Sequence, residues 1–293
     1  MKKHLITGAG GLIGAELIKH LLLDQENQVF AISRQQPTTD QDRLTYITLD
    51  FSTEWNTSVL PENIDTIIHL AQSPDFRDFP QKSESVFNVN TISTLKLLNY
   101  AQQTGVKKFV LASSGGIYGN GNNGFTENTP IITNKNLGFY LGTKLCSEII
   151  ADSYAQFFDL VMLRFFFVYG AHQRKDMLIP RLVGFVKNKQ PITLQGHDGL
   201  KINPIYVSDA VEAIIKSFDL KGNHKINIGG QEILSLREIG HIIGEVTGVS
   251  PEFKTDLESS AKNVIGDITK MSDILTPPKI SFKDGIKLLT SQS

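Results

Sequence analysis

The sequence has one cysteine, no long apolar run and no excess of charge of either sign. With Cys146 alone, neither an internal disulfide nor a cysteine-based metal site can form, so we expect a reducing compartment. The apolar stretch after Met1-Lys2-Lys3 is interrupted by glycines and charged side chains, and no run approaches the roughly 20 apolar residues of a membrane span. We therefore predict a cytoplasmic protein without a membrane partner.

The charges of the chain nearly cancel. In 293 residues, 29 lysines and arginines stand against 30 aspartates and glutamates, a net charge of -1. This balance offers no general attraction for nucleic acid, which we do not expect as a partner. The seven histidines are scattered without a pair at metal-ligand spacing, so we predict no metal site. His69 lies within an apolar run and is interpreted as a core histidine with satisfied hydrogen bonds.

Short apolar runs alternate with segments of helical periodicity in the first half of the chain, a pattern typical of a parallel sheet with crossover helices. Runs that are mostly Val, Ile, Leu and Phe predict strands over residues 4–7, 29–33, 46–49, 64–70, 109–113 and 160–165. Apolar spacings of three and four predict helices over residues 12–23, 83–103 and 138–158. Because these strands are apolar on both faces, helices should cover both sides of the sheet.

The second half has a different character. Helical patterns occur over residues 177–189, 207–218 and 236–248, and prolines interrupt the shorter pieces between them. We expect a smaller, more irregular C-terminal portion. Residues 115–124 hold five glycines and three asparagines and predict a loop. This loop is either a mobile surface turn or a flexible wall over a ligand, since it follows a central strand.

A glycine-rich turn follows the first predicted strand: residues 8–14 read GAGGLIG, and the helical pattern begins at Leu12. Gly8 permits a tight turn, Gly11 lets the backbone approach a pyrophosphate, and Gly14 allows the helix to pack closely on the strand. The free N–H groups and the dipole of a helix N-terminus favour a phosphate there. Placed after the first strand of an alternating chain, the turn predicts a dinucleotide site.

The end of the second predicted strand indicates which dinucleotide binds. It reads Ser33-Arg34, where a dinucleotide fold often has an acidic residue that binds the adenosine ribose 2′-hydroxyl. A carboxylate would repel a 2′-phosphate, whereas a hydroxyl and a guanidinium bind one. NADP is therefore favoured over NAD, unless Arg34 simply points into solvent. Asp50, after the third strand, could accept a hydrogen bond from the adenine amino group or could be only a turn carboxylate.

Tyr140 and Lys144 lie four residues apart on one predicted helix, so their side chains share a face. A phenol is a poor base at neutral pH, but a neighbouring ammonium stabilises the phenolate and lowers the pKa of the phenol. Tyr140 could then exchange a proton with a substrate hydroxyl or carbonyl. Ser114, at the end of the fifth predicted strand, could hold that oxygen at the edge of the sheet where ligands of parallel sheets collect.

On these and further segments the chain resembles the extended short-chain dehydrogenase/reductases of the NAD-dependent epimerase/dehydratase family, over nearly all of its length. Besides the glycine turn, the matching segments are residues 67–71 (IIHLA), Asn90, residues 113–119 (SSGGIYG), 140–144 (YLGTK), 163–164 (LR) with 168–170 (VYG), and 205–209 (IYVSD). The resemblance implies that Tyr140 is the acid/base, that Lys144 binds the nicotinamide ribose beside it, and that Ser114 binds the substrate oxygen.

These patterns together predict an α/β protein, with a Rossmann-like doubly wound parallel sheet and a smaller α/β C-terminal substrate-binding portion. The dinucleotide-binding domain should span residues 1–168, with a return segment near 202–228, and residues 169–293 should mainly bind substrate. The residues expected to bind the cofactor are Gly8, Gly11, Leu12, Ile13, Gly14, Ser33, Arg34, Asp50, Phe51, Leu70, Ala71, Asn90, Tyr140 and Lys144. Those expected to bind substrate are Ser114, Gly115, Phe167, Arg174, Arg181 and Lys201.

Departures from the family pattern narrow the reaction. Gly115-Gly116 stand where dehydratases of the family have an acidic pair that moves the protons of water elimination. The resemblance therefore favours ketone reduction or epimerisation over dehydration. Phe167 stands where sugar-nucleotide enzymes usually have an asparagine that contacts the substrate.

A second departure concerns the substrate's diphosphate. The resemblance places Ile202 where the family has a diphosphate-binding arginine, and Asn203 where an aspartate is common. An apolar group in place of a diphosphate partner is costly. Either Arg174, Arg181 or Lys201 compensates, or the substrate is not a sugar nucleotide.

We therefore expect hydride transfer between a nicotinamide and a carbinol or ketone carbon, as at C4 of a nucleotide-activated sugar, in a 4-ketoreductase or a 4-epimerase. One alternative is an NADPH-dependent reductase of a small non-nucleotide carbonyl compound. Another is a cofactor-binding sensor without turnover, although a sensor has no need of Ser114, Tyr140 and Lys144 together.

The predicted catalytic helix also has an apolar stripe, formed by Leu141, Leu145, Ile149 and Ile150. In the family this helix often builds a dimer through a four-helix bundle, so the stripe indicates either a homodimer or packing against the chain's own sheet. Cys146, two residues beyond Lys144, points to a different face and is predicted to pack as a small buried hydrophobe.

Overall fold

The computed structural model describes residues 1–35, 42–133 and 137–291. The chain forms two compact units, each assembled from separate stretches of sequence. Unit 1 consists of Met1–Ile117, Thr133–Arg164 and Ile214–Ile226, and unit 2 of Tyr118–Ile132, Phe165–Ala213 and Asn227–Ser293. The domain boundary near residue 168 stays a prediction.

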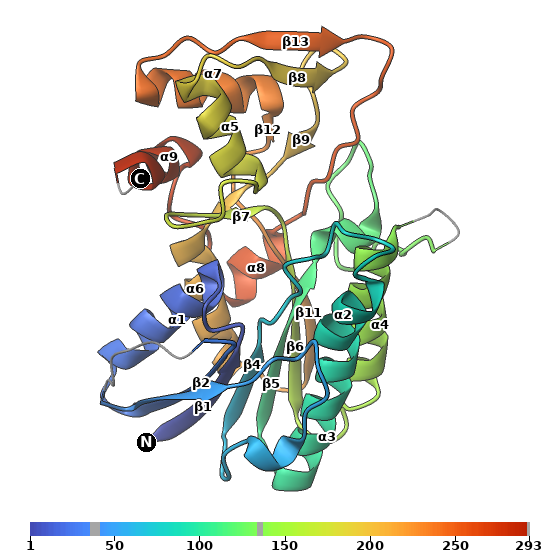
Figure 1. The fold of residues 1–293 in the computed structure, drawn as a ribbon, viewed down its shortest axis with the longest axis vertical. Coiled ribbons are helices and arrows are strands. Elements are labelled where there is room, and N and C mark those ends of the chain that lie inside the picture. The colour runs from blue at the N-terminus through green and yellow to red at the C-terminus, as the bar shows by residue number, and fades with distance from the viewer. Residues whose placement is uncertain (36–41, 134–136, 292–293) are drawn as a thin grey trace. The chain divides into compact units, whose positions relative to one another are not determined.

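Unit 1 is built on a seven-stranded sheet (Figure 1). Its strands, in spatial order, are β11 (Asn223–Ile228), β6 (Asp159–Phe165), β5 (Lys108–Ser114), β4 (Thr66–His69), β1 (Lys2–Thr7), β2 (Asn27–Ser33) and β3 (Leu44–Thr48). The pairings of β1 with β2 and β4, of β2 with β3, and of β4 with β5 are parallel. From β1 the chain adds β2 and β3 on one side and then β4, β5 and β6 on the other, so the direction of winding reverses at β1. Doubly wound sheets bind ligands at the carboxyl edge beside such a reversal.

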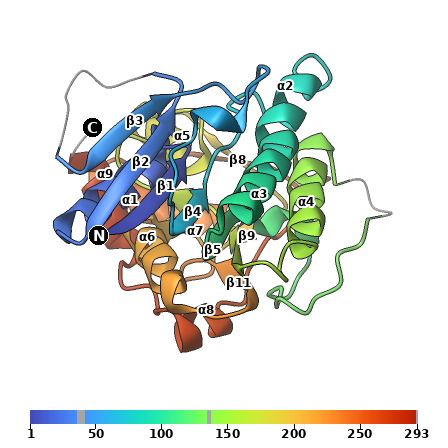
Figure 2. The same cartoon turned by 90° about the horizontal axis from the view of Figure 1, so that it is seen from below.

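The central strands form because their residues are apolar on both faces. Leu5 and Ile6 of β1, and Ile67 and Ile68 of β4, point alternately to opposite faces, and all four are fully buried. The sheet is therefore covered on both sides, with α1 on one face and α3 and α4 on the other (Figure 2). The helices of unit 1 are α1 (Leu12–Leu23), α2 (Ser83–Phe87), the π-helix η2 (Asn88–Ile92), α3 (Ser93–Thr104) and α4 (Phe139–Asp152), with short 3₁₀ turns η1 (Thr57–Val59), η3 (Gly115–Tyr118) and η4 (Ser217–Asp219).

The six predicted strands and the predicted doubly wound parallel sheet are confirmed. The helix predicted over residues 12–23 has those bounds. The helix predicted over 83–103 is interrupted by η2, and the one predicted over 138–158 ends at Asp152. The prediction missed β11 because its sequence, NHKINI, has two apolar residues among four polar ones.

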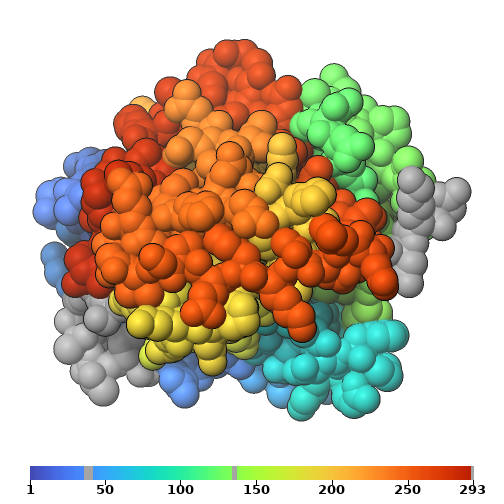
Figure 3. All heavy atoms as spheres, turned by 90° about the horizontal axis from the view of Figure 1, so that it is seen from above, coloured from blue at the N-terminus to red at the C-terminus, as the bar shows by residue number. Residues whose placement is uncertain are grey.

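Unit 2 combines helices with short pairs of strands. The strands are β7 (Val168–Tyr169), β8 (Ile192–Gln195), β9 (Lys201–Ile202), β10 (Ile205–Tyr206), β12 (Leu234–Ser235) and β13 (Phe253–Asp256). The helices are α5 (Leu178–Lys187), α6 (Val207–Lys216, which begins here), α7 (Leu236–Thr247), α8 (Thr269–Ile274) and α9 (Phe282–Ser291). Most of these strands have two residues, which is too short for a periodic pattern. In the space-filling view of Figure 3, residues of α7 and of the segment around β13, coloured orange, occupy the centre of the face that is shown.

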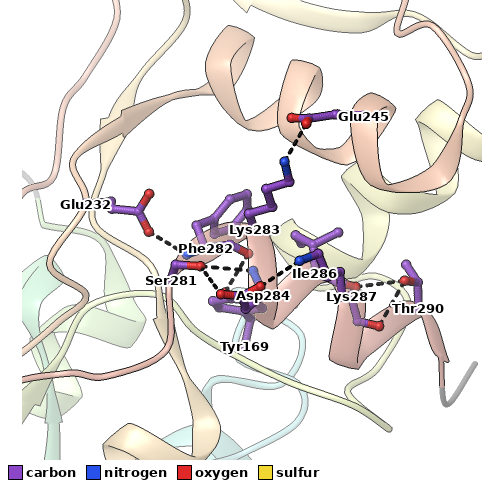
Figure 4. Close-up of polar contacts among 10 residues, drawn as sticks. All are labelled: Tyr169, Glu232, Glu245, Ser281, Phe282, Lys283, Asp284, Ile286, Lys287 and Thr290. Carbon is purple, nitrogen blue, oxygen red and sulfur yellow. Dashed lines mark hydrogen bonds and ion pairs between the residues drawn. The ribbon is translucent and has the colours of Figure 1, made fainter.

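Two segments that carry the family resemblance pair with each other in unit 2. Strand β7, from the VYG segment, is parallel to β10, from the IYVSD segment. The hydroxyl of Tyr169 donates to the carbonyl oxygen of Phe282, and Glu232 accepts the N–H of Phe282 (Figure 4). The Asp209 carboxylate accepts the N–H groups of Lys279 and Ile280, at 3.0 and 2.9 Å. These motif residues thus anchor the C-terminal segment of the chain.

The glycine-rich stretch 115–124 is fixed at two points in unit 2. The Tyr118 ring stacks on Phe125, with centroids 5.1 Å apart, and its hydroxyl donates to Asn227 over 3.0 Å. The N–H of Gly121 donates to the carbonyl oxygen of Asn263 over 3.0 Å. Of the two sequence interpretations, a freely mobile turn fits these contacts less well.

In the described part of the chain, no helix has the length and apolar character needed to cross a membrane.

Candidate active site

The glycine turn has the backbone geometry that its sequence predicts. Gly8 has φ of 70°, in the left-handed region that favours glycine, and a Cβ there would lie 2.9 Å from backbone atoms of Leu70 and Ala71. At Gly14 a Cβ would lie 2.3 Å from the carbonyl oxygen of Gly8, so the start of α1 packs directly on the turn.

Gly11 is the N-cap of α1, and among the described residues no side chain caps the first turn of this helix. The first-turn N–H groups, including those of Leu12 and Ile13, have no intrahelical acceptors. A cradle closed by glycines and lined by such N–H groups fits the pyrophosphate of a dinucleotide.

Ser33 ends β2 beside this turn, and Arg34 follows it. The Ser33 hydroxyl would lie 3.5 Å from a Cβ on Gly10. Arg34 is exposed and near Asp50. Burial raises the pKa of Asp50, but hydrogen bonds from Ser52 and the charge of Arg34 outweigh it and hold the pKa below its usual range. Since one Asp50 oxygen accepts both the N–H and the hydroxyl of Ser52, at 2.8 and 2.7 Å, Asp50 does act as a turn carboxylate.

His69, at the end of β4, is buried and bonded at both ring nitrogens. Its Nδ1 lies 2.7 Å from the Thr7 hydroxyl, and its Nε2 lies 3.0 Å from that of Thr94 and 3.2 Å from that of Ser93. Burial lowers the pKa of His69 to about 3, so the ring is neutral. It is a core histidine, as the sequence indicated, and the Thr7 hydroxyl also accepts the N–H of Ala71 at 3.1 Å.

The Tyr140 hydroxyl lies between two polar side chains. It donates to the amide oxygen of Gln72 over 2.8 Å, and a hydrogen bond also joins it to Ser114. Burial raises the pKa of Tyr140, and the bond with Ser114 acts in the opposite direction. The structure therefore brings the predicted Ser114 and Tyr140 together, with the phenol in its protonated form.

Lys144 is directed into unit 1. Its amine donates to the carbonyl oxygen of Ala112 in β5 over 3.0 Å. Burial lowers the pKa of Lys144 to about 8, and the carboxylate of Glu148 opposes this shift. Glu148 itself is buried and holds Arg164 of β6, with oxygen–nitrogen distances of 2.6 and 3.0 Å.

In the turn after Ser114, Gly116 lies close to the side chain of Leu141. The N–H of Gly116 donates to the Ser114 hydroxyl over 3.2 Å. A Cβ on Gly116 would lie 2.8 Å from a methyl group of Leu141, the neighbour of Tyr140 on α4. A side chain at position 116 would therefore require the Leu141 side chain to shift.

Two further predicted cofactor residues are engaged inside unit 1. The Phe51 ring packs in the core, 4.9 Å from the Trp55 ring. The Asn90 amide is 2% exposed; it accepts the N–H of Ser73 at 3.1 Å and donates to the Thr143 hydroxyl at 2.9 Å.

The predicted substrate residues of unit 2 lie on different elements. Phe167 has φ of 48°, a conformation that asparagine adopts more readily than a bulky residue. Arg174 forms an exposed ion pair with Asp176 at 2.8 Å. Arg181 is exposed on α5 and Lys201 on β9.

The two residues that depart from the diphosphate pattern are both core residues. Ile202 is fully buried in β9. The Asn203 side chain accepts the N–H of Gly266 and donates to the carbonyl oxygens of Gly266 and Gly230, all within 3.2 Å. In this part of unit 2 the chain therefore uses these positions for packing.

Sequence reasoning missed Gln72 and the ion pair of Glu148 with Arg164. The signal that could have indicated Gln72 is its position: it is a polar residue just beyond the carboxyl end of the central strand β4. The prediction for Cys146 was wrong, because this residue is exposed. Two positions turn a helix by about 200°, which takes Cys146 away from the buried face that carries Lys144. Among the described residues, no group of three or more His, Cys, Asp or Glu side chains could hold a metal ion.

Comparisons with known proteins identify relatives of this chain. The model of the NAD dependent epimerase/dehydratase family matches residues 4–229. An uncharacterized UDP-glucose epimerase of Bacillus subtilis is 30% identical over 97% of this chain and 95% of its own. A dTDP-4-dehydro-6-deoxyglucose reductase of Escherichia coli is 28% identical, with 98% and 96% covered.

A solved structure is also similar over its whole length. It is a tyrosine-to-phenylalanine mutant of UDP-glucuronic acid 4-epimerase from Bacillus cereus, in complex with UDP-4-deoxy-4-fluoro-glucuronic acid and NAD. Its TM-score is 0.87 and its identity 27%, with 99% of this chain and 98% of that chain covered. From the match of the family model and the identity to relatives along nearly its full length, the chain belongs to the NAD-dependent epimerase/dehydratase family.

Proposed function

We propose that this protein is an NAD(P)-dependent 4-epimerase of a nucleotide-activated sugar, which oxidises C4 to a transient ketone and reduces it again. The observation that carries the proposal is the pairing of Tyr140 with Ser114 in the unit that also holds the glycine turn. Both the epimerase relative and the crystallised epimerase support a sugar nucleotide as substrate.

The chain's own residues would move the proton. When bound, the nicotinamide supplies a site that accepts the hydride from C4 and returns it. Ionised to the phenolate, Tyr140 takes the proton of the C4 hydroxyl and gives it back when the ketone is reduced, while the Ser114 hydroxyl holds the C4 oxygen. Lys144, when protonated, favours the phenolate by its positive charge.

A 4-ketoreductase is the second candidate, because Ser33-Arg34 favour the 2′-phosphate of NADP, and NADPH in cells drives reduction. The reductase relative supports this candidate as well. NAD is the cofactor in the similar crystal structure, so NAD binding has support from the comparison and an NADP preference rests on these two residues alone.

The phosphates of the substrate need cationic partners, for which we propose Arg174, Arg181 and Lys201. The aromatic Phe167 and the buried Ile202 favour instead a small carbonyl compound without a nucleotide. The two substrate classes differ in a measurable way, since a sugar nucleotide that binds raises the melting temperature of the protein.

We also propose that the protein is cytoplasmic. We propose in addition that it forms a homodimer through the outer face of α4. Ile149 is 61% exposed on this helix, and the exposed Cys146 lies beside it. A surface with such an apolar residue on a central helix is suited to pack against its own copy.

The deciding experiment uses purified protein without added cofactor. UDP-glucose and UDP-glucuronate are incubated with it, and NMR spectroscopy follows the C4 proton of each sugar. A 4-epimerase yields the C4 epimer with no net oxidation or reduction. Steady consumption of NADPH with a 4-keto sugar, and no epimer from either sugar, would establish the reductase instead.

A further inference from the structure

The contact between Gln72 and Tyr140 has no part in the proposed proton transfer. Gln72 is exposed and lies three residues beyond β4, while Tyr140 lies in the first turn of α4. The two residues are 68 positions apart, and the phenol hydroxyl donates to the amide oxygen over 2.8 Å. The bond therefore joins the loop after β4 to the helix that carries the proposed acid/base.

A ring of hydrogen bonds holds these two segments together. Ser73, next to Gln72, donates its N–H to the Asn90 side chain over 3.1 Å. The Asn90 amide donates to the Thr143 hydroxyl over 2.9 Å, and this hydroxyl donates to the carbonyl oxygen of Tyr140 over 2.6 Å. Because Ser73, Asn90 and Thr143 are all buried, the backbone at Gln72 is fixed relative to the backbone at Tyr140.

The same loop also packs on the phenol ring. The Phe76 ring lies 5.1 Å from the Tyr140 ring, at an angle of 50°. Contact with an aromatic neighbour limits the orientations of the phenol. Both the hydroxyl and the ring of Tyr140 are therefore positioned by residues 72–76.

The hydrogen bonds around the phenol have a direction. The Gly116 N–H donates to the Ser114 hydroxyl, Ser114 is bonded to the phenol oxygen, and the phenol donates to Gln72. An acceptor such as the Gln72 amide oxygen stabilises the neutral phenol, because ionisation would set a phenolate against a carbonyl oxygen. Gln72 and Ser114 thus favour opposite states of the same group.

We infer that Gln72 is a positioning residue for Tyr140, whose amide oxygen holds the phenol proton and aims the hydroxyl until a substrate oxygen takes its place. The inference rests on the proposed role of Tyr140 in proton transfer. When a substrate oxygen displaces this acceptor, the phenol can release its proton to water, and the phenolate then takes the proton of the substrate hydroxyl.

The test titrates residue 140 directly in the full-length protein, with and without NAD. The tyrosine there is replaced by 3,5-difluorotyrosine, whose phenol ionises at lower pH because fluorine withdraws electrons, and ¹⁹F NMR follows its ionisation. Gln72→Met removes the acceptor and keeps the length of the side chain, and Gln72→Glu keeps an acceptor and adds negative charge. Gln102→Met and Gln102→Glu, at an exposed position on α3, are the matched controls.

Loss of one hydrogen bond to the neutral phenol predicts a pKa lower by about half a unit to one unit in Gln72→Met. Gln72→Glu should raise the pKa, and the two controls should leave it unchanged. Because substrate displaces Gln72, the acidic limb of the kcat/KM profile, which reports the free enzyme, should move to lower pH in Gln72→Met and to higher pH in Gln72→Glu. A merely structural role would lower activity without moving this limb.

An unchanged or higher pKa in Gln72→Met overturns the inference, because the amide would then be a spectator or a donor to the phenolate. That result leaves the proposed function intact. Turnover of Tyr140→Phe equal to that of the unaltered protein would instead refute the proposed function, and it would leave the pKa values measured in the fluorotyrosine proteins as they are.

Discussion

The carboxylate of Glu148 lies 2.6 Å from the guanidinium of Arg164, and the two side chains are 2% and 3% exposed. The pair joins α4 to β6, one helical turn beyond Lys144. The negative charge of Glu148 raises the pKa of Lys144 against the burial that lowers it to about 8. A single carboxylate therefore binds the buried guanidinium and opposes the loss of a proton from the proposed catalytic amine.

Removal of this carboxylate should destabilise the protein. Glu148→Ala leaves Arg164 as a buried charge without its carboxylate, which typically costs about 3 to 5 kcal/mol of unfolding free energy. Urea denaturation measures this loss. The control is Glu16→Ala, which breaks an exposed ion pair with Lys19 and should cost less than about 1 kcal/mol. Equal losses in the two variants would contradict a structural role of the buried pair.

Neutralising the charge of Glu148 should shift the pH dependence of turnover. In Glu148→Gln the charge that raises the pKa of Lys144 is gone, so this pKa falls below about 8. Lys144 then loses its proton at lower pH, and the alkaline limb of the pH–rate profile should move toward neutral pH. A limb that stays in place in a folded Glu148→Gln protein would show that turnover does not depend on the charge of Lys144.

Two glycines within helices should respond in opposite ways to alanine. In Gly14→Ala the new Cβ meets the backbone of the glycine turn at 2.3 Å, which should weaken NAD binding and destabilise the fold by about 1 to 3 kcal/mol. Gly142, on α4, has open space where a Cβ would lie, so Gly142→Ala should stabilise the protein by up to about 1 kcal/mol. Calorimetry measures both effects. NAD binding by Gly14→Ala at unchanged affinity would exclude the turn as the dinucleotide site.

Arg34 should separate the two dinucleotides. If its guanidinium binds the 2′-phosphate, Arg34→Leu weakens NADP binding roughly tenfold, as expected for one charge-assisted hydrogen bond. NAD has no 2′-phosphate, and its affinity for the same variant is the internal control. Isothermal titration calorimetry measures the affinity for both cofactors. If Arg34→Leu weakens NADP and NAD binding equally, or weakens neither, Arg34 does not bind the 2′-phosphate.

What the sequence predicts well is local. Leu5, Ile67 and their neighbours are apolar on both faces of their strands, and Gly8 and Gly14 stand at fixed places in a turn, so pattern alone indicates the sheet and the cradle. Contacts between distant segments carry no such pattern. The bond from Tyr140 to Gln72 spans 68 positions and depends on how the loop after β4 closes over α4.

Buried polar residues are the other source of missed features. Glu148 and Arg164 read as ordinary charged residues, and only the packing of α4 on β6 shows that both are in the core. Strand β11 is polar in sequence but lies at the end of the sheet order, beside β6, where one neighbouring strand suffices to define it. The exposure of Cys146 likewise depends on which face of α4 the sheet covers.

The most direct test of the account compares Tyr140→Phe with the unaltered protein, using the sugar nucleotide that is turned over and NAD at saturation. Loss of a general acid/base predicts a fall in kcat of about 10² to 10⁴-fold. NAD affinity and melting temperature should stay unchanged, because the ring remains in place. A Tyr140→Phe protein that epimerises or reduces its substrate at the normal rate would contradict proton transfer by this phenol.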